Sequence, residues 1–197
     1  MTMSTPKSHD PALVAEIAAH YREILRLIGE NPEREGLLKT PERAAKALLD
    51  ATCGYKADLK ELSQKAIFEH DGSGMVMVRG IEIYSLCEHH ILPFFGSITV
   101  AYIPDGRIIG LSKLGRIADA FARRLQVQER LTKQLCDFLT DAIPNKGVIV
   151  SCQARHLCMQ MRGVEKQMSE TRTLEYTGQF ATSPELRAEF LHHAMEK

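Results

Sequence analysis

The stretch MVMVRGIEIYSLCEHHILPFFGSITVAYIP, residues 75–104, decides the fold of this chain. Its first part is rich in β-branched residues and alternates at Ile81 and Ile83. Its last part, SITVAYIP, ends at Pro104, directly before the turn pair Asp105-Gly106. Both patterns are typical of β-strands. The sequence therefore predicts two strands with a polar cluster, CEHH, between them.

Helical periodicity surrounds these two strands. Asp10-Pro11 predicts the start of a helix, a second helix is expected from about Thr40 to Cys53, and a short third one within residues 56–62. Five further elements are expected after the strand pair, in the order helix, helix, strand, strand, helix: residues 112–125, 127–143, 146–159, 171–180 and 183–195.

This order of elements predicts an α+β fold with a mainly antiparallel, four-stranded sheet. Two helices are inserted between the strand pairs, and N-terminal helices precede them. We expect an N-terminal helical region over residues 1–70 and one catalytic domain over residues 71–197. Four strands leave two open edges, which proteins usually pair or shield. Association of subunits through these edges is therefore expected.

The composition excludes several classes of protein. The chain has 197 residues, and 25 Lys plus Arg balance 25 Asp plus Glu, so no overall positive charge favours nucleic acid or anionic membranes. No apolar run reaches the ~20 residues needed to cross a bilayer, and the first residues lack the apolar core of a signal peptide. Five cysteines without an export signal favour reduced thiols and a cytoplasmic location.

The CEHH cluster supplies metal ligands. Cys87 and His90 form a C-x-x-H pair whose side chains converge if the chain turns where the strand ends. In the later strand, His156 and Cys158 share one face by alternation, about 6 to 7 Å apart. We expect Cys87, His90 and Cys158 to bind zinc, since thiolate and imidazole are the ligands that zinc prefers. His89 would then point away from the metal.

Three protein ligands favour an open, catalytic zinc site, because a structural site is normally closed by a fourth Cys or His. Two alternatives stay open on spacing alone. The cysteines can be core residues beside hydrogen-bonded histidines, or the metal can serve a non-enzymatic module in which it joins strand to strand. A fourth protein ligand would favour the non-enzymatic module.

Several motifs together resemble one enzyme family. CEHH, GLSKLGRI, QVQERLT and HLCMQMRGV follow one another at the family spacing, and GLLKTPERAAKAL fits as well. In the identity and order of these motifs the sequence resembles GTP cyclohydrolase I, over about Gly36 to Phe190. The resemblance implies a tunnelling fold, a toroidal homodecamer with sites at subunit interfaces, and the conversion of GTP to 7,8-dihydroneopterin triphosphate and formate. That reaction begins pterin and folate biosynthesis, and the resemblance leaves allosteric regulation open.

The remaining alternative is another tunnelling-fold enzyme with a related substrate. Such relatives have all-histidine zinc sites, or a nucleophilic cysteine and no metal, and neither matches this Cys/His/Cys pattern.

The resemblance also assigns roles to individual residues. Cys87, His90 and Cys158 match the zinc ligands, and His89 and His156 match the two catalytic histidines. Gln128 and Glu129 match the groups that recognise guanine, although an acid near a helix start with Lys133 four residues later is also an ordinary surface pair. The triphosphate would be bound by a basic set at the start of the 112–125 helix and by two further arginines: Ser112, Lys113, Arg116, Arg162 and Arg43.

Overall fold

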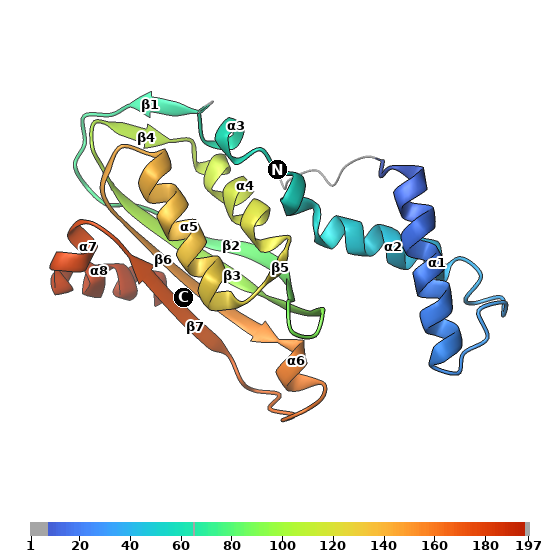
Figure 1. Cartoon of the computed structure of the whole chain (residues 1–197). Helices are drawn as coiled ribbons and strands as arrows, with labels where there is room; N and C mark the ends of the chain where they lie inside the picture. The colour runs from blue at the N-terminus through green and yellow to red at the C-terminus, as the bar shows by residue number, and fades with distance from the viewer. Residues whose placement is uncertain (1–7, 65, 196–197) are drawn as a thin grey trace. The chain divides into compact units, whose positions relative to one another are not determined.

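A computed structural model describes residues 8–64 and 66–195 of the chain (Figure 1). The chain forms two compact units that divide after Cys53. Residues 54–64 and 66–70, expected to belong to the helical region, therefore pack with the larger unit. The functional division into residues 1–70 and 71–197 stays a prediction, and residues 1–7, 65, 196 and 197 of those ranges lie outside the described residues.

The N-terminal unit contains two helices, α1 (Pro11–Leu27) and α2 (Thr40–Ala51). The carboxylate of Asp10 accepts a hydrogen bond from the backbone N–H of Ala12 at 2.9 Å, which caps α1 as the Asp-Pro pair predicts. Val14 and Ala45 are buried between apolar stripes of the two helices. The predictions of both helices are confirmed.

The larger unit is built on a five-stranded sheet in the order β5-β2-β3-β6-β7. Four of its strands are antiparallel neighbours: β2 (Val76–Cys87), β3 (Leu92–Pro104), β6 (Asn145–His156) and β7 (Thr171–Tyr176). The predicted α+β fold with four antiparallel strands is confirmed. Three shorter strands were not predicted: β5 (Leu125–Gln126), parallel to β2, and β1 (Ile67–Glu69) with β4 (Arg107–Ile109), which form a separate ribbon.

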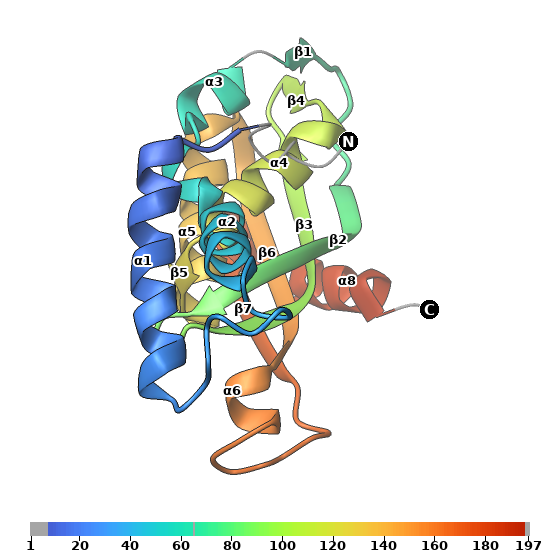
Figure 2. The same cartoon turned by 90° about the vertical axis from the view of Figure 1, so that its right-hand side faces the viewer.

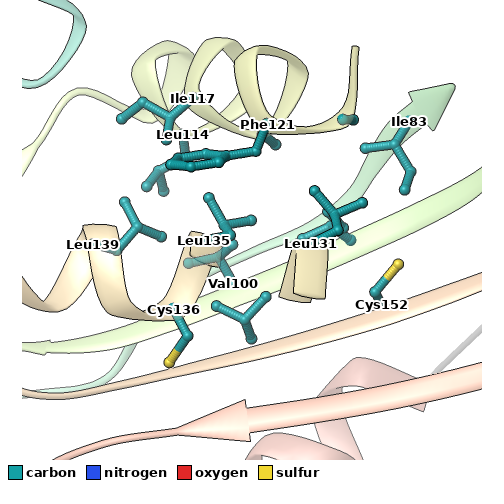
Figure 3. Close-up of a cluster of buried hydrophobic side chains, with 14 of the residues drawn as sticks. Ile83, Val100, Leu114, Ile117, Phe121, Leu131, Leu135, Cys136, Leu139 and Cys152 are labelled. Carbon is teal, nitrogen blue, oxygen red and sulfur yellow. The ribbon is translucent and has the colours of Figure 1, made fainter. Parts of the chain in front are cut away.

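One face of the sheet carries the main core. The helices α4 (Leu111–Ala122) and α5 (Gln128–Ala142) lie side by side on it (Figure 1). Figure 3 shows their apolar side chains directed toward each other and toward the strands. The buried set from the two helices is Leu114, Ile117, Phe121, Leu131, Leu135 and Leu139. This packing fixes the first turn of α5 against the sheet.

The opposite face of the sheet is covered over only part of its length. α7 (Gln179–Thr182) and α8 (Pro184–Met195) lie against this face, as Figure 2 shows for α8. Phe180 and Phe190 are buried there with Ala101, Ile103 and Ile149. Two short helices precede the sheet along the chain. They are the 3-10 turn η1 (Cys53–Lys56), which begins at the boundary between the two units, and α3 (Leu59–Gln64). Among the described helices, none has the length and apolarity to cross a bilayer.

Both outer edges of the sheet remain largely unpaired within the described chain. β7 pairs only with β6, and β2 pairs on its outer side with β5 only at Leu86 and Cys87. Free backbone donors and acceptors along such edges favour pairing with another strand. The expected association of subunits through these edges fits this arrangement and stays a prediction.

Candidate metal centre and active site

Three segments far apart in the sequence meet at one end of the sheet. They are the end of β2 with the turn after it, the end of β6 with the short helix α6 (Leu157–Gln160), and the first turn of α5. Figure 2 shows α6 and the loop behind it projecting beyond this end of the sheet. Most of the predicted site residues lie here.

The three predicted metal ligands converge at this end. One ligand atom each from Cys87, His90 and Cys158 lies within 4.8 Å of the other two. Cys87 is buried, Cys158 is half-buried and His90 is exposed, so the group opens to the surface. Two sulfurs and one imidazole form a donor set that suits zinc and other thiophilic ions. The geometry therefore provides a site capable of holding a metal.

A tight turn brings Cys87 and His90 together. The carbonyl oxygen of Cys87 accepts hydrogen bonds from the backbone N–H of His90 at 3.2 Å and of Ile91 at 2.8 Å. Ile91 closes the turn with a φ of 55°, a left-handed conformation that is uncommon for a β-branched residue. The predicted convergence at the strand end is thus produced by a turn that stores backbone strain directly beside a ligand.

The route by which Cys158 reaches the group differs from the prediction. The strand was expected to continue through Cys158, whereas β6 ends at His156 and Cys158 lies in the first turn of α6. Pairing of β6 stops at this point: its last partner on β3 is Phe94, opposite His156, and on β7 it is Thr171, opposite Ala154. Without a ladder on either side the chain is free to coil, so a helical turn, not strand alternation, delivers Cys158.

Burial separates the five cysteines into two groups. Cys53 is buried at the end of the N-terminal unit, and Cys136 and Cys152 are buried in the core of the larger unit, as expected for Cys152. Burial raises the pKa of Cys136 and of Cys152 to about 12, so both thiols stay protonated at neutral pH. Among the described residues, Cys87 and Cys158 are the cysteines that belong to a group capable of holding a metal. Without a metal ion, burial and the neighbouring Cys87 also raise the pKa of Cys158.

His89 lies close to the group without joining it. Its Nδ1 is 3.9 Å from the sulfur of Cys87, the same distance as the Nδ1 of His90. The two rings are nearly perpendicular, at an interplanar angle of 84°, and the side chain of His89 is 64% exposed. Adjacent residues cannot direct both rings alike, so His89 faces solvent.

His156 is held far more tightly than His89. Its ring stacks on that of the fully buried Phe94, with centroids 4.7 Å apart and an interplanar angle of 8°. Its Nε2 lies 2.8 Å from the Oε1 of Gln128 in the first turn of α5. Burial lowers the pKa of His156, and the charge of the nearby Glu129 opposes this shift. The ring is therefore an imidazole held in a fixed position beside the metal-capable group.

The two neighbours Gln128 and Glu129 have different surroundings. Gln128 is 1% exposed, and its amide nitrogen donates to Cys152, Thr171 and Thr173. Glu129 is exposed and has no hydrogen-bond partner within residues 8–64 and 66–195. Among the described residues no hydrogen bond or ion pair joins Glu129 to Lys133, whose ammonium group donates to Asp137 at 2.9 Å. Glu129 is thus free to bind a ligand.

A contact that the sequence analysis missed joins the CEHH turn to α5. The guanidinium of Arg130 donates to the carboxylate of Glu88, and its Nε donates to the Oε1 of Gln126 at 3.0 Å. Glu88 also donates its backbone N–H to the carbonyl of Gln126 at 3.0 Å. Arg130 lowers the pKa of Glu88. Only the acid within CEHH hinted at this contact, and its partner is 42 positions away.

The predicted phosphate-binding residues on α4 lie in the first half of this helix, which starts at the other end of the sheet. Ser112, Lys113 and Arg116 lie in the first turns of α4, as expected for a helix start. That start is tied to the beginning of β2, because the backbone of Ile109 donates to the hydroxyl of Tyr102, which pairs with Val76. α4 has 12 residues and is about 18 Å long. Its other end leads to β5 beside Cys87 (Figure 1).

Of the two remaining predicted arginines, Arg162 belongs to this end of the sheet, where its charge acts on Cys158. Arg162 is exposed in the loop that follows α6, close in sequence to Cys158. Arg43 is exposed on α2, in the N-terminal unit. The larger unit therefore gathers the metal ligands, both histidines and Arg162 at one end of the sheet, whereas Ser112, Lys113 and Arg116 lie on α4 and Arg43 belongs to the N-terminal unit.

Comparisons with known proteins agree with the motifs. The family model described as GTP cyclohydrolase I matches residues 17–195. GTP cyclohydrolase 1 of Leptospira biflexa is 58% identical over 169 residues, which cover 86% of this chain and 92% of that protein. The same-named protein of Chlorobium phaeovibrioides is 54% identical over 188 residues, covering 93% and 84%.

A third relative, GTP cyclohydrolase 1 of Alkalilimnicola ehrlichii, is 55% identical over 175 residues and covers 89% of this chain and 95% of that protein. Among solved structures, an archaeosine synthase QueF-Like in the apo form overlaps partially, with a TM-score of 0.44 and 17% identity over 55% of this chain and 97% of that one. The family match spans nearly the whole described chain and agrees with the order of strands and helices expected of a tunnelling fold. The chain belongs to the GTP cyclohydrolase I family.

Proposed function

We propose that this protein is a zinc-dependent GTP cyclohydrolase I, which converts GTP and water to 7,8-dihydroneopterin triphosphate and formate. The observation that carries the proposal is the convergence of Cys87, His90 and Cys158 beside the fixed ring of His156, in a chain of this family. Dihydroneopterin triphosphate is a pterin precursor, so the enzyme acts at the start of pterin and folate biosynthesis, in the cytoplasm.

Cys87, His90 and Cys158 would hold the zinc ion. Zinc bound by three protein ligands supplies Lewis acidity and lowers the pKa of a water molecule in its remaining position. The half-buried sulfur of Cys158 and the exposed ring of His90 leave the group accessible from the surface. The buried Cys87 anchors it to the end of β2.

The two histidines would transfer protons during opening of the imidazole ring of GTP. We assign protonation of purine nitrogen 7 to His156, because its ring is held in one place by Phe94 and Gln128. We assign the later proton transfers, after hydrolysis has released carbon 8 as formate, to the exposed His89. Imidazoles suit this work because their ordinary pKa lies near neutrality.

Recognition of guanine would depend on Glu129. A carboxylate accepts two hydrogen bonds, one from the ring N–H and one from the exocyclic amine of guanine, and adenine does not present this pair. Glu129 is exposed, unpaired among the residues described and next to the residue that contacts His156. These features support a carboxylate that is available to a purine bound at the metal group.

The triphosphate would be bound by Ser112, Lys113 and Arg116 of a neighbouring subunit. Within one chain Ser112 and Lys113 lie at the far end of α4 from Cys87 and Arg116 lies near its middle, which supports sites that are completed between subunits. The open edges of β2 and β7 support a closed ring, and we propose the toroidal homodecamer of the family. Arg162 and Arg43 would add further phosphate contacts.

The proposal is tested by incubating the purified zinc-loaded protein with GTP. We expect equimolar formate and a product that becomes a fluorescent pterin after oxidation, and we expect both to disappear with a chelator and to return with zinc. The variant His156→Ala should retain zinc and lose formate release. Full retention of formate release by that variant, or no release by the wild type, would contradict the proposal.

A further inference from the structure

We infer that Gln128 is a positioning residue, which holds His156 in one ring orientation and one tautomer, and does not read guanine. The inference rests on the proposed function, because His156 acts there on the purine. It differs from the sequence-based expectation, in which Gln128 and Glu129 share the recognition of guanine. The hydrogen bonds of the Gln128 carboxamide distinguish a role in positioning His156 from a role in binding guanine.

All polar atoms of the Gln128 side chain are already used inside the protein. Its Nε2 lies 3.0 Å from the carbonyl of Cys152, 3.1 Å from that of Thr171 and 3.2 Å from the hydroxyl of Thr173. These acceptors belong to β6 and β7, so the amide bridges two strands from the start of α5. A substrate that bound this amide would have to leave buried carbonyls unsatisfied, which costs free energy.

The same contacts fix which end of the amide faces His156. A flipped amide would direct its oxygen at two carbonyl oxygens, and oxygen atoms cannot donate to each other. The Oε1 of Gln128 therefore faces the Nε2 of His156, at 2.8 Å. Since Oε1 only accepts, Nε2 must carry the hydrogen. In the neutral ring the lone pair is then on Nδ1.

A second, independent contact fixes the plane of the ring. Phe94 is fully buried and stacks on His156 with an interplanar angle of 8°. Stacking restricts tilting of the ring, and the hydrogen bond from Nε2 restricts its rotation within that plane. Nδ1 has no hydrogen-bond partner in the described parts of the chain, so it is the nitrogen available to a ligand. Gln128 thereby selects the atom of His156 that exchanges a proton with substrate.

The variant Gln128→Met tests the inference, because it retains the length of the side chain and removes the acceptor. Histidine labelled with 15N reports the tautomer in zinc-loaded protein by magic-angle-spinning NMR, with His156→Ala identifying the signal. We expect the wild-type ring to carry its hydrogen on Nε2 and the variant to lose this preference. A wild-type signal with the hydrogen on Nδ1 would overturn the inference.

Steady-state kinetics separate positioning from binding. Gln128→Met should lower kcat roughly 10- to 100-fold, with KM for GTP within about twofold and zinc content unchanged. The matched variant Glu129→Gln should raise KM and leave the tautomer of His156 unchanged. An increase in KM for Gln128→Met at unchanged kcat would show that Gln128 binds substrate and would overturn the inference.

A milder variant keeps the test decisive if Gln128→Met fails to fold. Thr173→Val removes one of the three acceptors of the Gln128 amide and leaves His156 and the substrate contacts untouched. We expect a smaller decrease in kcat, about 2- to 10-fold, again at constant KM. An unchanged kcat together with a raised KM for GTP in Thr173→Val would contradict the positioning role of Gln128. The NMR signal does not depend on turnover, so absence of formate from the wild type would refute the proposed function and not the role of Gln128.

Discussion

The two ends of the sheet in the larger unit differ sharply in how complete they are. At the end where β2 and β6 stop, His156 is stacked and hydrogen-bonded, Glu88 is paired with Arg130, and the three ligand atoms of the metal group lie within 4.8 Å. At the other end, the polar start of α4 presents Ser112 and Lys113 with no side-chain hydrogen bond or ion pair in the described residues.

This contrast indicates which residues of the proposed site come from one chain and which residues a chain supplies to the site of a neighbouring subunit. Groups that must hold a metal and move protons are fixed by the packing of their own chain. Groups that bind flexible phosphates need only be brought near, and a second copy can supply them. The following experiments substitute residues at one end of the sheet at a time, or combine two variants so that a site receives its two ends from different chains.

The largest effect is expected from breaking the metal group. Cys158→Ala removes one of three protein ligands, so we expect loss of bound zinc and a decrease in kcat of at least about 1,000-fold. Metal analysis and the formate assay measure both. The matched control is Cys152→Ala in the preceding strand, whose buried thiol should cost only about 1 kcal/mol of stability and leave the zinc content unchanged. Zinc retained at full occupancy in Cys158→Ala would refute the ligand assignment.

Removing a histidine should separate chemistry from metal binding. For His156→Ala we expect a decrease in kcat of about 100- to 10,000-fold with one zinc still bound per chain. The physical reason is loss of proton transfer without loss of a ligand. Loss of zinc in proportion to the loss of activity would instead show that His156 is a metal ligand. It would contradict the separation of proton transfer from metal binding at this end of the sheet.

Joining the two ends from different chains tests whether a neighbour completes the site. Arg116→Ala should raise KM for GTP about 10- to 100-fold, since a charge-assisted contact with phosphate is lost. The exposed Arg26→Ala, which removes a surface pair with Glu23, serves as the charge-matched control. At a GTP concentration well below the KM of Arg116→Ala, coexpression of Cys158→Ala with Arg116→Ala should restore activity at about a quarter of the sites. Activity no higher than the mean of the two separate variants would show that each site belongs to one chain.

The smallest effect is expected at the contact between the CEHH turn and α5. Because Arg130 lowers the pKa of Glu88, this carboxylate stabilises the folded state above its ordinary pKa of 4.5, and the contribution is lost as the pH falls below that value. Glu88→Gln should therefore unfold at lower denaturant concentration than the wild type at pH 7, and the gap should narrow toward pH 4. Denaturation of the metal-free proteins measures this difference. A gap that stays constant would exclude the ion pair as its cause.

The strands and helices with clear periodicity were predictable, and so was the C-x-x-H pair. The sequence could not reveal β5, because two residues carry no periodicity, nor the helical turn at Cys158, because HLCM is compatible with either continuation. Gln128 and Glu129 were given one shared role by the family resemblance. Their opposite burial depends on α5 packing on β6 and β7, which no local pattern encodes. The pairing of Glu88 with Arg130 is equally a product of the tertiary fold.

X-ray absorption at the zinc edge of the loaded protein tests the account most directly. We predict two sulfur ligands and a single imidazole from the protein, with a spectrum that His89→Ala leaves unchanged, although the Nδ1 of His89 lies 3.9 Å from the sulfur of Cys87. Two imidazoles in the wild type, one of them lost in His89→Ala, would reveal a closed shell with no position for solvent, and would contradict the enzymatic account.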